Sequence, residues 1–281
     1  GSGWSRLADR HGFALLFPEQ QRSNNANLCF NWFELGDIRR DAGEASSIAE
    51  MIAGTLTGYG LDRRRVFVTG LSAGGAMAAV MLATYPELFA GGAVIAGLPY
   101  GSASTVPEAL ERMRGQGLPG EDALLRAVRA ASPHGGPWPR LSVWHGQQDH
   151  VVVPAAGEAV LSQWRGLHGL AEGPSEILSI GPHRRRVWRD GGGVARIEAF
   201  ALAGMGHGTP IDAGDGIGVP GPHMLQAAIS STRHIAAFWD IGDPVSGTAT
   251  RPGPERSAAG EAAAGPGRII EQALRAAGLM R

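Results

Sequence analysis

The chain alternates short apolar runs with longer segments whose apolar residues recur at helical spacing. The short runs are continuous and rich in β-branched and aromatic residues, which is typical of strands covered on both faces. This alternation predicts an α/β fold with a mainly parallel sheet flanked by helices. The predicted strands are Phe13–Phe17, Val66–Thr69, Ala93–Ala96, Leu141–Trp144 and Ile197–Leu202, and the predicted helices are Asp41–Leu56, Ala76–Thr84, Pro154–Trp164 and Leu225–Trp239.

Other segments depart from this pattern. Val187–Arg189, a triple glycine and Ile197–Leu202 are also compatible with a local hairpin. Residues 102–139 carry helical segments broken by Gly and Pro and predict an insertion over the active edge of the sheet. Residues 242–267 are rich in Pro, Gly, Ala and Ser and predict a flexible linker. Residues 268–281 then predict a short amphipathic helix, so that residues 1–241 form the main domain.

Composition narrows the classes of protein that fit. A chain of 281 residues with 43% hydrophobic content can build one sizeable core. The net charge of −1 gives no polyanion-binding face, which argues against nucleic acid as a partner. No run of about eighteen apolar residues predicts a membrane-spanning helix. The single Cys29 excludes an intramolecular disulfide and a thiolate-rich metal site in this sequence.

A strand-to-helix junction carries the strongest chemical signal. The run Arg65–Thr69 leads into Gly70-Leu71-Ser72-Ala73-Gly74, and a small-residue helix from Gly75 follows. This is a G-x-S-x-G nucleophile elbow, in which a sharp turn presents a serine hydroxyl at the sheet edge. With 43 glycines a chance match is easy, so the position of the motif between strand and helix matters more than the match itself. The pattern predicts Ser72 as a nucleophile.

A serine nucleophile needs a base and an acid that orients the base. In alpha/beta-hydrolase folds, which this elbow resembles, the acid and then the histidine follow the serine along the chain. Asp149 follows the strand Leu141–Trp144 and is the predicted acid. It could instead cap the helix that begins at Pro154, and Asp190 and Asp212 are rival acids.

Nine histidines compete for the role of base. His207 lies in a glycine-flanked loop directly after the strand Ile197–Leu202, and it is the predicted base. His234 falls within a predicted helix and is interpreted as structural. His145 ends a strand, but a His-Gly oxyanion loop normally precedes the nucleophile, and His150 is interpreted as a neighbour of Asp149.

The oxyanion of acyl transfer needs two N–H donors. The backbone N–H of Ala73, the residue after the nucleophile, is one predicted donor. The second donor normally comes from a loop after an earlier strand, and nothing between Gly1 and Val66 offers it.

Several further stretches resemble the polyhydroxybutyrate depolymerase-type esterases, which are related to feruloyl and acetylxylan esterases. The matching stretches are Gly3-Trp4-Ser5, Leu7-Ala8-Asp9, Phe17-Pro18-Glu19-Gln20, Cys29-Phe30-Asn31-Trp32-Phe33, Val68 to Met77, Val143-Trp144-His145-Gly146 with Asp149, and Gly204-Met205-Gly206-His207-Gly208. The resemblance runs to about Trp239 and implies an alpha/beta-hydrolase fold with a triad of Ser72, Asp149 and His207.

The resemblance also implies features that this sequence lacks. An upstream strand and a His-Gly-Cys oxyanion loop are expected before residue 1, so the sheet is predicted to lack its N-terminal strands. Cys29 is then either half of a pair with a cysteine in that loop or a buried free thiol. Asn31 and Trp32 are candidate substrate-binding residues, although a Trp in an apolar run is more often part of the core.

The sequence therefore predicts a serine esterase acting through an acyl-enzyme, with no metal or organic cofactor. The resemblance implies an extracellular enzyme acting on small or oligomeric esters, without nucleic acid or membrane partners. The resemblance implies polyhydroxybutyrate or 3-hydroxyacyl oligoesters as substrates, with feruloyl or acetyl esters of plant polysaccharide as the alternative. A peptidase is disfavoured because no gating domain is present. A catalytically weak binding protein is the alternative from another class, since half the oxyanion hole is missing.

Overall fold

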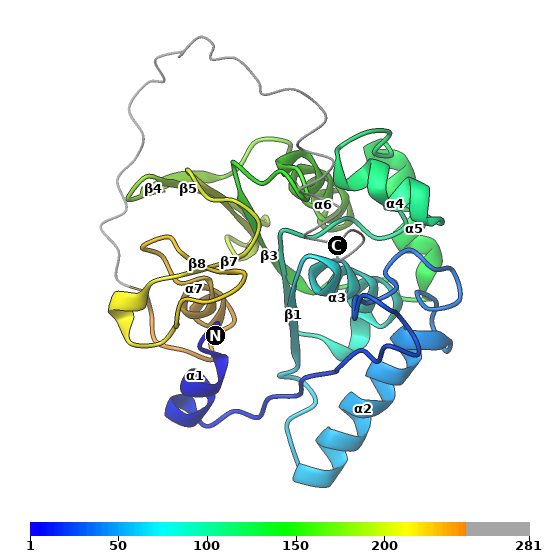
Figure 1. The fold of residues 1–281 in the computed structure, drawn as a ribbon, viewed down its shortest axis with the longest axis horizontal. Coiled ribbons are helices and arrows are strands. Elements are labelled where there is room, and N and C mark those ends of the chain that lie inside the picture. The colour runs from blue at the N-terminus through cyan, green and yellow to red at the C-terminus, as the bar shows by residue number, and fades with distance from the viewer. Residues whose placement is uncertain (246–281) are drawn as a thin grey trace.

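Six strands form the main sheet of the computed structural model, which describes residues 1–245 (Figure 1). The strand order is β1-β2-β3-β6-β5-β4. Four strands are parallel, namely β1 (Phe67–Leu71), β2 (Gly91–Ile95), β3 (Arg140–Gly146) and β6 (Ala195–Leu202). The strands β5 (His183–Arg189) and β4 (Glu176–Ile180) add antiparallel pairs beside β6. The predicted α/β class, four of the five predicted strands and the hairpin alternative are therefore confirmed.

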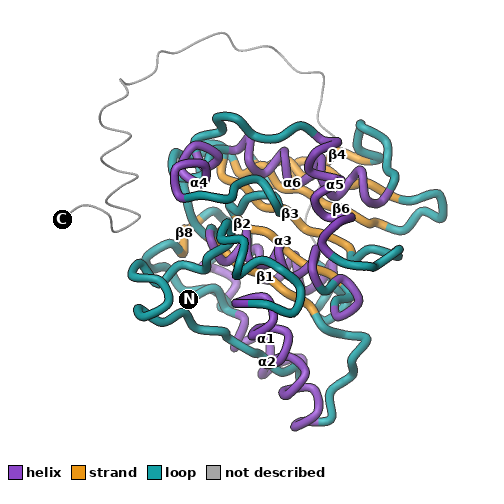
Figure 2. Tube along the Cα trace, turned by 90° about the vertical axis from the view of Figure 1, so that its right-hand side faces the viewer, coloured by secondary structure: helices purple, strands orange, loops and turns teal. Residues whose placement is uncertain are grey.

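Helices cover both faces of this sheet and lie on either side of its central strands in Figure 1, while Figure 2 is turned so that the right-hand side faces the viewer. On one face lie α2 (Gly43–Tyr59), α3 (Ala73–Thr84), α5 (Glu121–Ala131) and α6 (Pro154–His168), whose apolar residues share a core with Val94 and Val143. On the other lie α1 (Trp4–His11) and α7 (Ser231–Phe238), which share a core with Ile95, Trp144 and Phe200. Side chains on both faces of β2 and β3 are therefore buried, as their continuous apolar runs require.

Small residues let α3 lie close against the sheet. Every residue of α3 from Gly75 to Thr84 is buried, and four of them are alanines. The helix carries no polar face, so its orientation is set by packing on all sides rather than by one apolar stripe. Since α3 begins directly after Ser72, this packing fixes the position of the serine.

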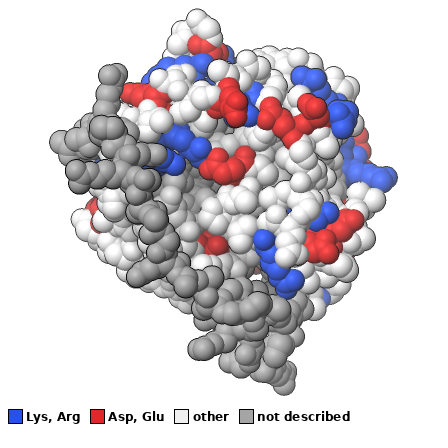
Figure 3. All heavy atoms as spheres, turned by 90° about the horizontal axis from the view of Figure 1, so that it is seen from above, with Lys and Arg blue, Asp and Glu red and all other residues white. Residues whose placement is uncertain are grey.

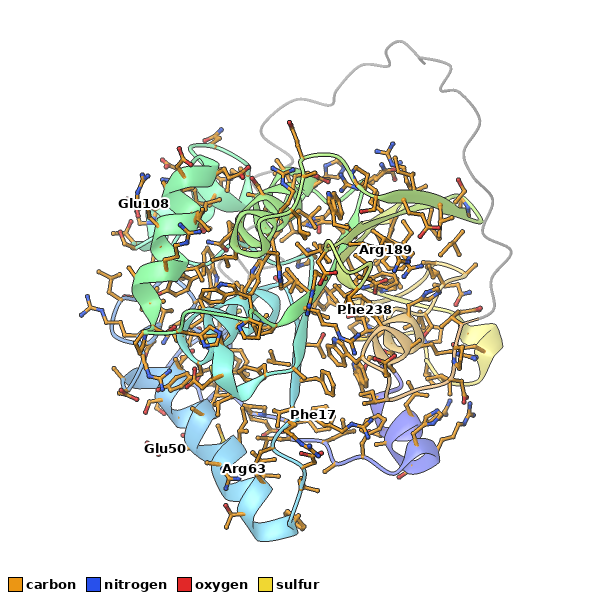
Figure 4. The ribbon with its side chains drawn as sticks, turned by 180° about the vertical axis from the view of Figure 1, so that it is seen from behind. Phe17, Glu50, Arg63, Glu108, Arg189 and Phe238 are labelled. Atoms are coloured by element: carbon orange, nitrogen blue, oxygen red, sulfur yellow. The ribbon has the colours of Figure 1, made fainter. Side chains whose placement is uncertain are left out.

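The strand predicted over Phe13–Phe17 is not formed, and this expectation is wrong. A strand needs hydrogen bonds from a neighbouring strand. In the described residues β1 is the edge of the sheet, and a groove of about 620 Å³ is lined by both β1 and residues 13–17. Figure 4 shows Phe17 near the end of β1, and its side chain is 63% exposed. The segment therefore runs beside the sheet without joining it.

The helix predicted over Leu225–Trp239 is shorter than expected. Residues Met224–Gln226 form β8, which pairs in parallel with β7 (Thr209–Ile211) in a small second sheet. The helix α7 begins only at Ser231, where the Ser230 hydroxyl accepts a hydrogen bond from Arg233 N at 3.4 Å. A serine N-cap of this kind marks the start of a helix. The helix was predicted to begin at Leu225 because this apolar residue continues the helical spacing.

The remaining elements are short. The segment predicted as an insertion contains α4 (Val106–Met113) and α5, and two 3-10 helices lie at Pro86–Leu88 and Ala213–Asp215. The predicted linker lies outside the described residues beyond residue 245, as does the predicted helix over 268–281. The division of the chain into these domains stays a prediction.

The face seen in Figure 3 carries no large patch of like charge, because arginines and acidic residues are interspersed on it. Within residues 1–245 none of the helices combines the length and the hydropathy of a membrane span.

Candidate active site

Ser72 occupies a strained turn between β1 and α3. Its backbone has φ 57° and ψ −120°, a conformation that side-chain-bearing residues rarely adopt. Two hydrogen bonds fix the turn, because Ser72 N donates to Ile95 O and Ala76 N donates to Ser72 O, both at 2.9 Å. Strain of this kind costs about 1–3 kcal/mol and persists only where its surroundings enforce it. The turn is thus held by β2 on one side and by α3 on the other.

Two glycines beside Ser72 allow this close approach. A Cβ on Gly70 would collide with the backbone of Gly74. A Cβ on Gly75 would lie 3.0 Å from both Gly70 O and Ile95 O. Gly70 of the motif and Gly75, the residue that follows it, therefore allow the strand and the helix to cross closely.

Asp149 lies in the loop after β3, and its side chain is buried. Its Oδ2 accepts a hydrogen bond from His207 Nδ1 at 2.8 Å. Its Oδ1 accepts hydrogen bonds from the backbone N–H groups of Val151 and Val152, both at 2.9 Å. Both oxygens of the carboxylate are thus held by hydrogen-bond donors. The structure brings the predicted acid and the predicted base together.

Strand order explains this meeting. The carboxyl ends of β1, β2, β3 and β6 lie at one edge of the sheet because these strands are adjacent and parallel. Backbone bonds beyond the strands tie the loops together, since Ala96 N donates to Trp144 O at 2.8 Å and Gln147 N donates to Leu202 O at 2.9 Å. Ser72, Asp149 and His207 all follow this edge. A hydrogen bond between Ser72 Oγ and His207 Nε2 stays a prediction.

The rival acids are used elsewhere. Asp190 accepts hydrogen bonds from Gly192 N and Val194 N in the β5–β6 turn and pairs with Arg196 at 2.7 Å. Asp212 caps a 3-10 helix by accepting from Gly214 N at 3.0 Å. Asp190 therefore stabilises a turn and Asp212 caps a helix.

A second histidine lies against His207 and gave no signal in the sequence. The rings of His207 and His223 are edge-to-face, with centroids 6.3 Å apart. The pairing of β7 with β8 brings them together, since Thr209 N donates to His223 O at 2.7 Å. His223 also has a positive φ of 57°. It is exposed and lies 16 residues after His207, so only the tertiary pairing could reveal it.

Asn31 and Trp32 lie in a loop held by a buried carboxylate. Glu44 Oε2 accepts a hydrogen bond from Asn31 N at 2.8 Å, and Asn31 Nδ2 donates to Asp37 Oδ2 at 2.9 Å. Burial raises the pKa of Glu44 above its ordinary value. Trp32 is buried in a cluster that includes Val152, and Ala73 packs against that cluster. The indole is therefore close to both the elbow and the acid loop, and substrate contact by either residue stays a prediction.

Ala73 is the first residue of α3. The first N–H groups of a helix have no partner within it and lie at its positive end, so this amide suits an oxyanion. No set of three or more His, Cys, Asp or Glu side chains among residues 1–245 is arranged to hold a metal ion.

Cys29 is a free thiol on the surface. The expectation of a buried thiol is therefore wrong, because the loop that carries Cys29 does not enter the core. Its pairing with a second cysteine stays a prediction.

Comparison with known proteins identifies a family for this chain. The family model "Esterase PHB depolymerase" matches residues 1–186. The chain is 40% identical to poly(3-hydroxyalkanoate) depolymerase C of Paucimonas lemoignei over 248 residues, which cover 85% of this chain and 59% of that protein. It is 32% identical to feruloyl esterase B of Talaromyces stipitatus, over 73% of this chain and 58% of that protein.

A solved structure agrees with the fold. The acetyl xylan esterase from Aspergillus awamori superposes with a TM-score of 0.68 at 26% identity, covering 76% of this chain and 79% of that chain. The chain spans less than two thirds of the length of the depolymerase and the feruloyl esterase named above. The elbow, the paired acid and histidine and the family match lead to one conclusion: this chain belongs to the esterase PHB depolymerase family, with an alpha/beta-hydrolase fold.

Proposed function

We propose that this protein is a serine esterase with a triad of Ser72, His207 and Asp149. The observation that carries the proposal is the 2.8 Å hydrogen bond between His207 Nδ1 and Asp149 Oδ2, at the sheet edge that also bears the strained Ser72. That bond places the His207 proton on Nδ1 and leaves Nε2 free to accept a proton. Membership of an esterase family supports the same chemistry.

The reaction then follows from these groups. His207 Nε2 accepts the proton of the Ser72 hydroxyl as Ser72 Oγ attacks the ester carbonyl carbon. Asp149 stabilises the imidazolium that forms, and the Ala73 N–H stabilises the developing oxyanion. The imidazolium gives its proton to the leaving alcohol, and an acyl-enzyme remains. Water, deprotonated by His207, then releases the acid and restores the serine.

We infer that short 3-hydroxyacyl esters are the preferred substrates. A relative named for poly(3-hydroxyalkanoate) is 40% identical to this chain, whereas the feruloyl esterase is 32% identical. Buried Trp32 would form the apolar wall of the acyl site, because its cluster adjoins Ala73. Asn31 would hold that wall in place through Glu44. We also propose an extracellular location, since the polyester in the name of the 40% identical relative is too large to enter a cell and its short 3-hydroxyacyl products would form outside it.

Comparison of matched substrates tests this proposal. Hydrolysis of p-nitrophenyl acetate, p-nitrophenyl butyrate, a 3-hydroxybutyrate trimer and methyl ferulate would be measured for the natural chain and for Ser72→Ala. We expect turnover that Ser72→Ala lowers by about 10⁶-fold, with unchanged far-UV circular dichroism. Faster cleavage of methyl ferulate than of the trimer would replace the 3-hydroxyacyl assignment with the feruloyl one. Turnover retained by the alanine variant would remove Ser72 from its role.

A further inference from the structure

A buried histidine lies beneath the acid loop and takes no part in the proposed reaction. His145 is in β3, and its side chain is almost fully buried. Its Nε2 lies 2.8 Å from Val152 O and 3.6 Å from Asp149 Oδ2. Because a carbonyl oxygen can only accept, Nε2 must carry a proton and donate it to Val152 O. The tautomer of His145 is therefore fixed by its surroundings.

This arrangement carries a cost in stability. Burial lowers the pKa of His145, which favours the neutral form of the ring. A neutral imidazole protonated on Nε2 has a lone pair on Nδ1, and that atom is buried without a hydrogen-bond partner among the described residues. His183 differs, because its Nδ1 accepts from Ala203 N at 3.2 Å and its Nε2 lies 2.7 Å from Ala227 O. An unpaired buried polar atom needs an explanation beyond packing.

The neighbouring helix is adapted to the ring. A Cβ on Gly157, in α6, would lie 2.6 Å from His145 Nδ1. A glycine within a helix costs up to about 1 kcal/mol relative to alanine. The imidazole at position 145 is thus accompanied by two unfavourable features, a glycine within a helix and an unpaired nitrogen.

The hydrogen bond from His145 stabilises the turn that holds the acid. Val152 donates its N–H to Asp149 Oδ1 and accepts from His145 through its carbonyl. The ring therefore fixes the peptide unit that follows Val152 while the Val152 N–H fixes the carboxylate. We propose that His145 is a positioning residue for the acid, its Nε2–H holding the turn at 149–152 so that Asp149 Oδ2 faces His207. This role rests on the proposed function, since it needs Asp149 to act through His207.

Substitutions of the ring test the role of the donor. His145→Phe keeps a flat ring without a donor, and His145→Gln keeps an N–H near the place of Nε2. We expect His145→Phe to lower kcat by about 10-fold to 100-fold, because a misplaced catalytic group costs this much, with KM little changed. We expect His145→Gln to recover most of kcat. The control His168→Phe removes a partly buried histidine with a similar carbonyl contact, to Pro139 O at 3.1 Å, and should leave kcat unchanged.

A second pair of variants leaves the imidazole chemistry intact. Gly157→Ala forces the ring to move, whereas Gly166→Ala, on the same helix, places a Cβ no closer than 3.5 Å to its neighbours. Gly157→Ala should therefore lower kcat and Gly166→Ala should not. These variants decide the question if His145→Phe does not fold. Equal kcat for Gly157→Ala and Gly166→Ala, or a Gln variant as slow as the Phe variant, would overturn the proposal.

A spectroscopic measurement separates this proposal from the proposed function. The proton between His207 Nδ1 and Asp149 gives a downfield resonance in ¹H NMR, whether or not an ester is turned over. We expect His145→Phe to shift or broaden that resonance and His145→Gln to retain it. An unchanged resonance in His145→Phe contradicts the positioning role. Loss of esterase activity in the natural chain, with the resonance still responding to His145, would contradict the proposed function alone.

Discussion

His207 Nδ1 and Asp149 Oδ2 are joined at 2.8 Å although 58 residues separate them in the chain. The bond is formed because β3 and β6 are neighbours in the sheet and both end at the same edge. The acid is fixed by backbone amides on its other oxygen, so it has little freedom to turn away from the ring. The orientation of the imidazole therefore depends on one loop.

Replacement of this acid by its amide tests the orientation. In Asp149→Asn the side chain can donate to His207 Nδ1, which favours the wrong tautomer and leaves Nε2 protonated. We expect kcat for p-nitrophenyl acetate to fall by about 10⁴-fold with little change in fold. Asp190→Asn is the control, since Asp190 holds a hairpin turn, and it should keep its turnover. Equal losses in both variants would show that Asp149 is not the acid.

The strain at Ser72 predicts an unusual order of stabilities. Ser72→Gly should be more stable to urea than Ser72→Ala by about 1 kcal/mol, because glycine tolerates φ 57° at little cost. At Ser46, inside α2, the order should be reversed, since glycine is the poorer helix former. Unfolding curves of the four variants give both differences. The same order at both positions would show that Ser72 is not strained.

The sequence allowed the elbow, the acid and the base to be predicted because each signal is local. Ser72 lies in a short motif, and Asp149 and His207 each follow a recognisable strand. The flanking strands and helices were predicted to within a few residues for the same reason. Residues 13–17 have the composition of a strand, but strand formation depends on a partner that composition does not supply.

Tertiary contacts decide the features that were missed. His145 was considered only as an oxyanion residue, and its bond to Val152 O becomes visible only when the acid loop folds back on β3. His223 depends on the pairing of two three-residue strands, which are too short to carry a periodic signal. Neither residue could be assigned from its neighbours in the sequence.

The environment of His168 predicts that the free energy of unfolding falls in mild acid. Burial lowers the pKa of His168 from 6.5 to about 4, so the folded protein resists a proton that the unfolded chain accepts below pH 6.5. Its neutral form therefore contributes stability above pH 6.5 that is lost as the pH falls toward 4. Urea unfolding from pH 4 to 8 should show that the free energy of unfolding falls less with decreasing pH in His168→Phe than in the natural chain. Parallel curves for the two proteins would contradict the assignment.

The free edge of β1 predicts self-association of the chain. The groove beside this strand is lined with apolar side chains and borders Phe17, which is 63% exposed. Exposed strand edges next to apolar surface invite pairing with another chain. We expect sedimentation velocity to show association that grows with protein concentration, and Phe17→Glu to weaken it by placing a charge at the groove. Tyr59→Glu changes an aromatic residue that is 78% exposed on α2 and does not line the groove, so it should leave association unchanged. Equal effects of the two substitutions would show that general surface hydrophobicity, and not the β1 groove, holds the copies together.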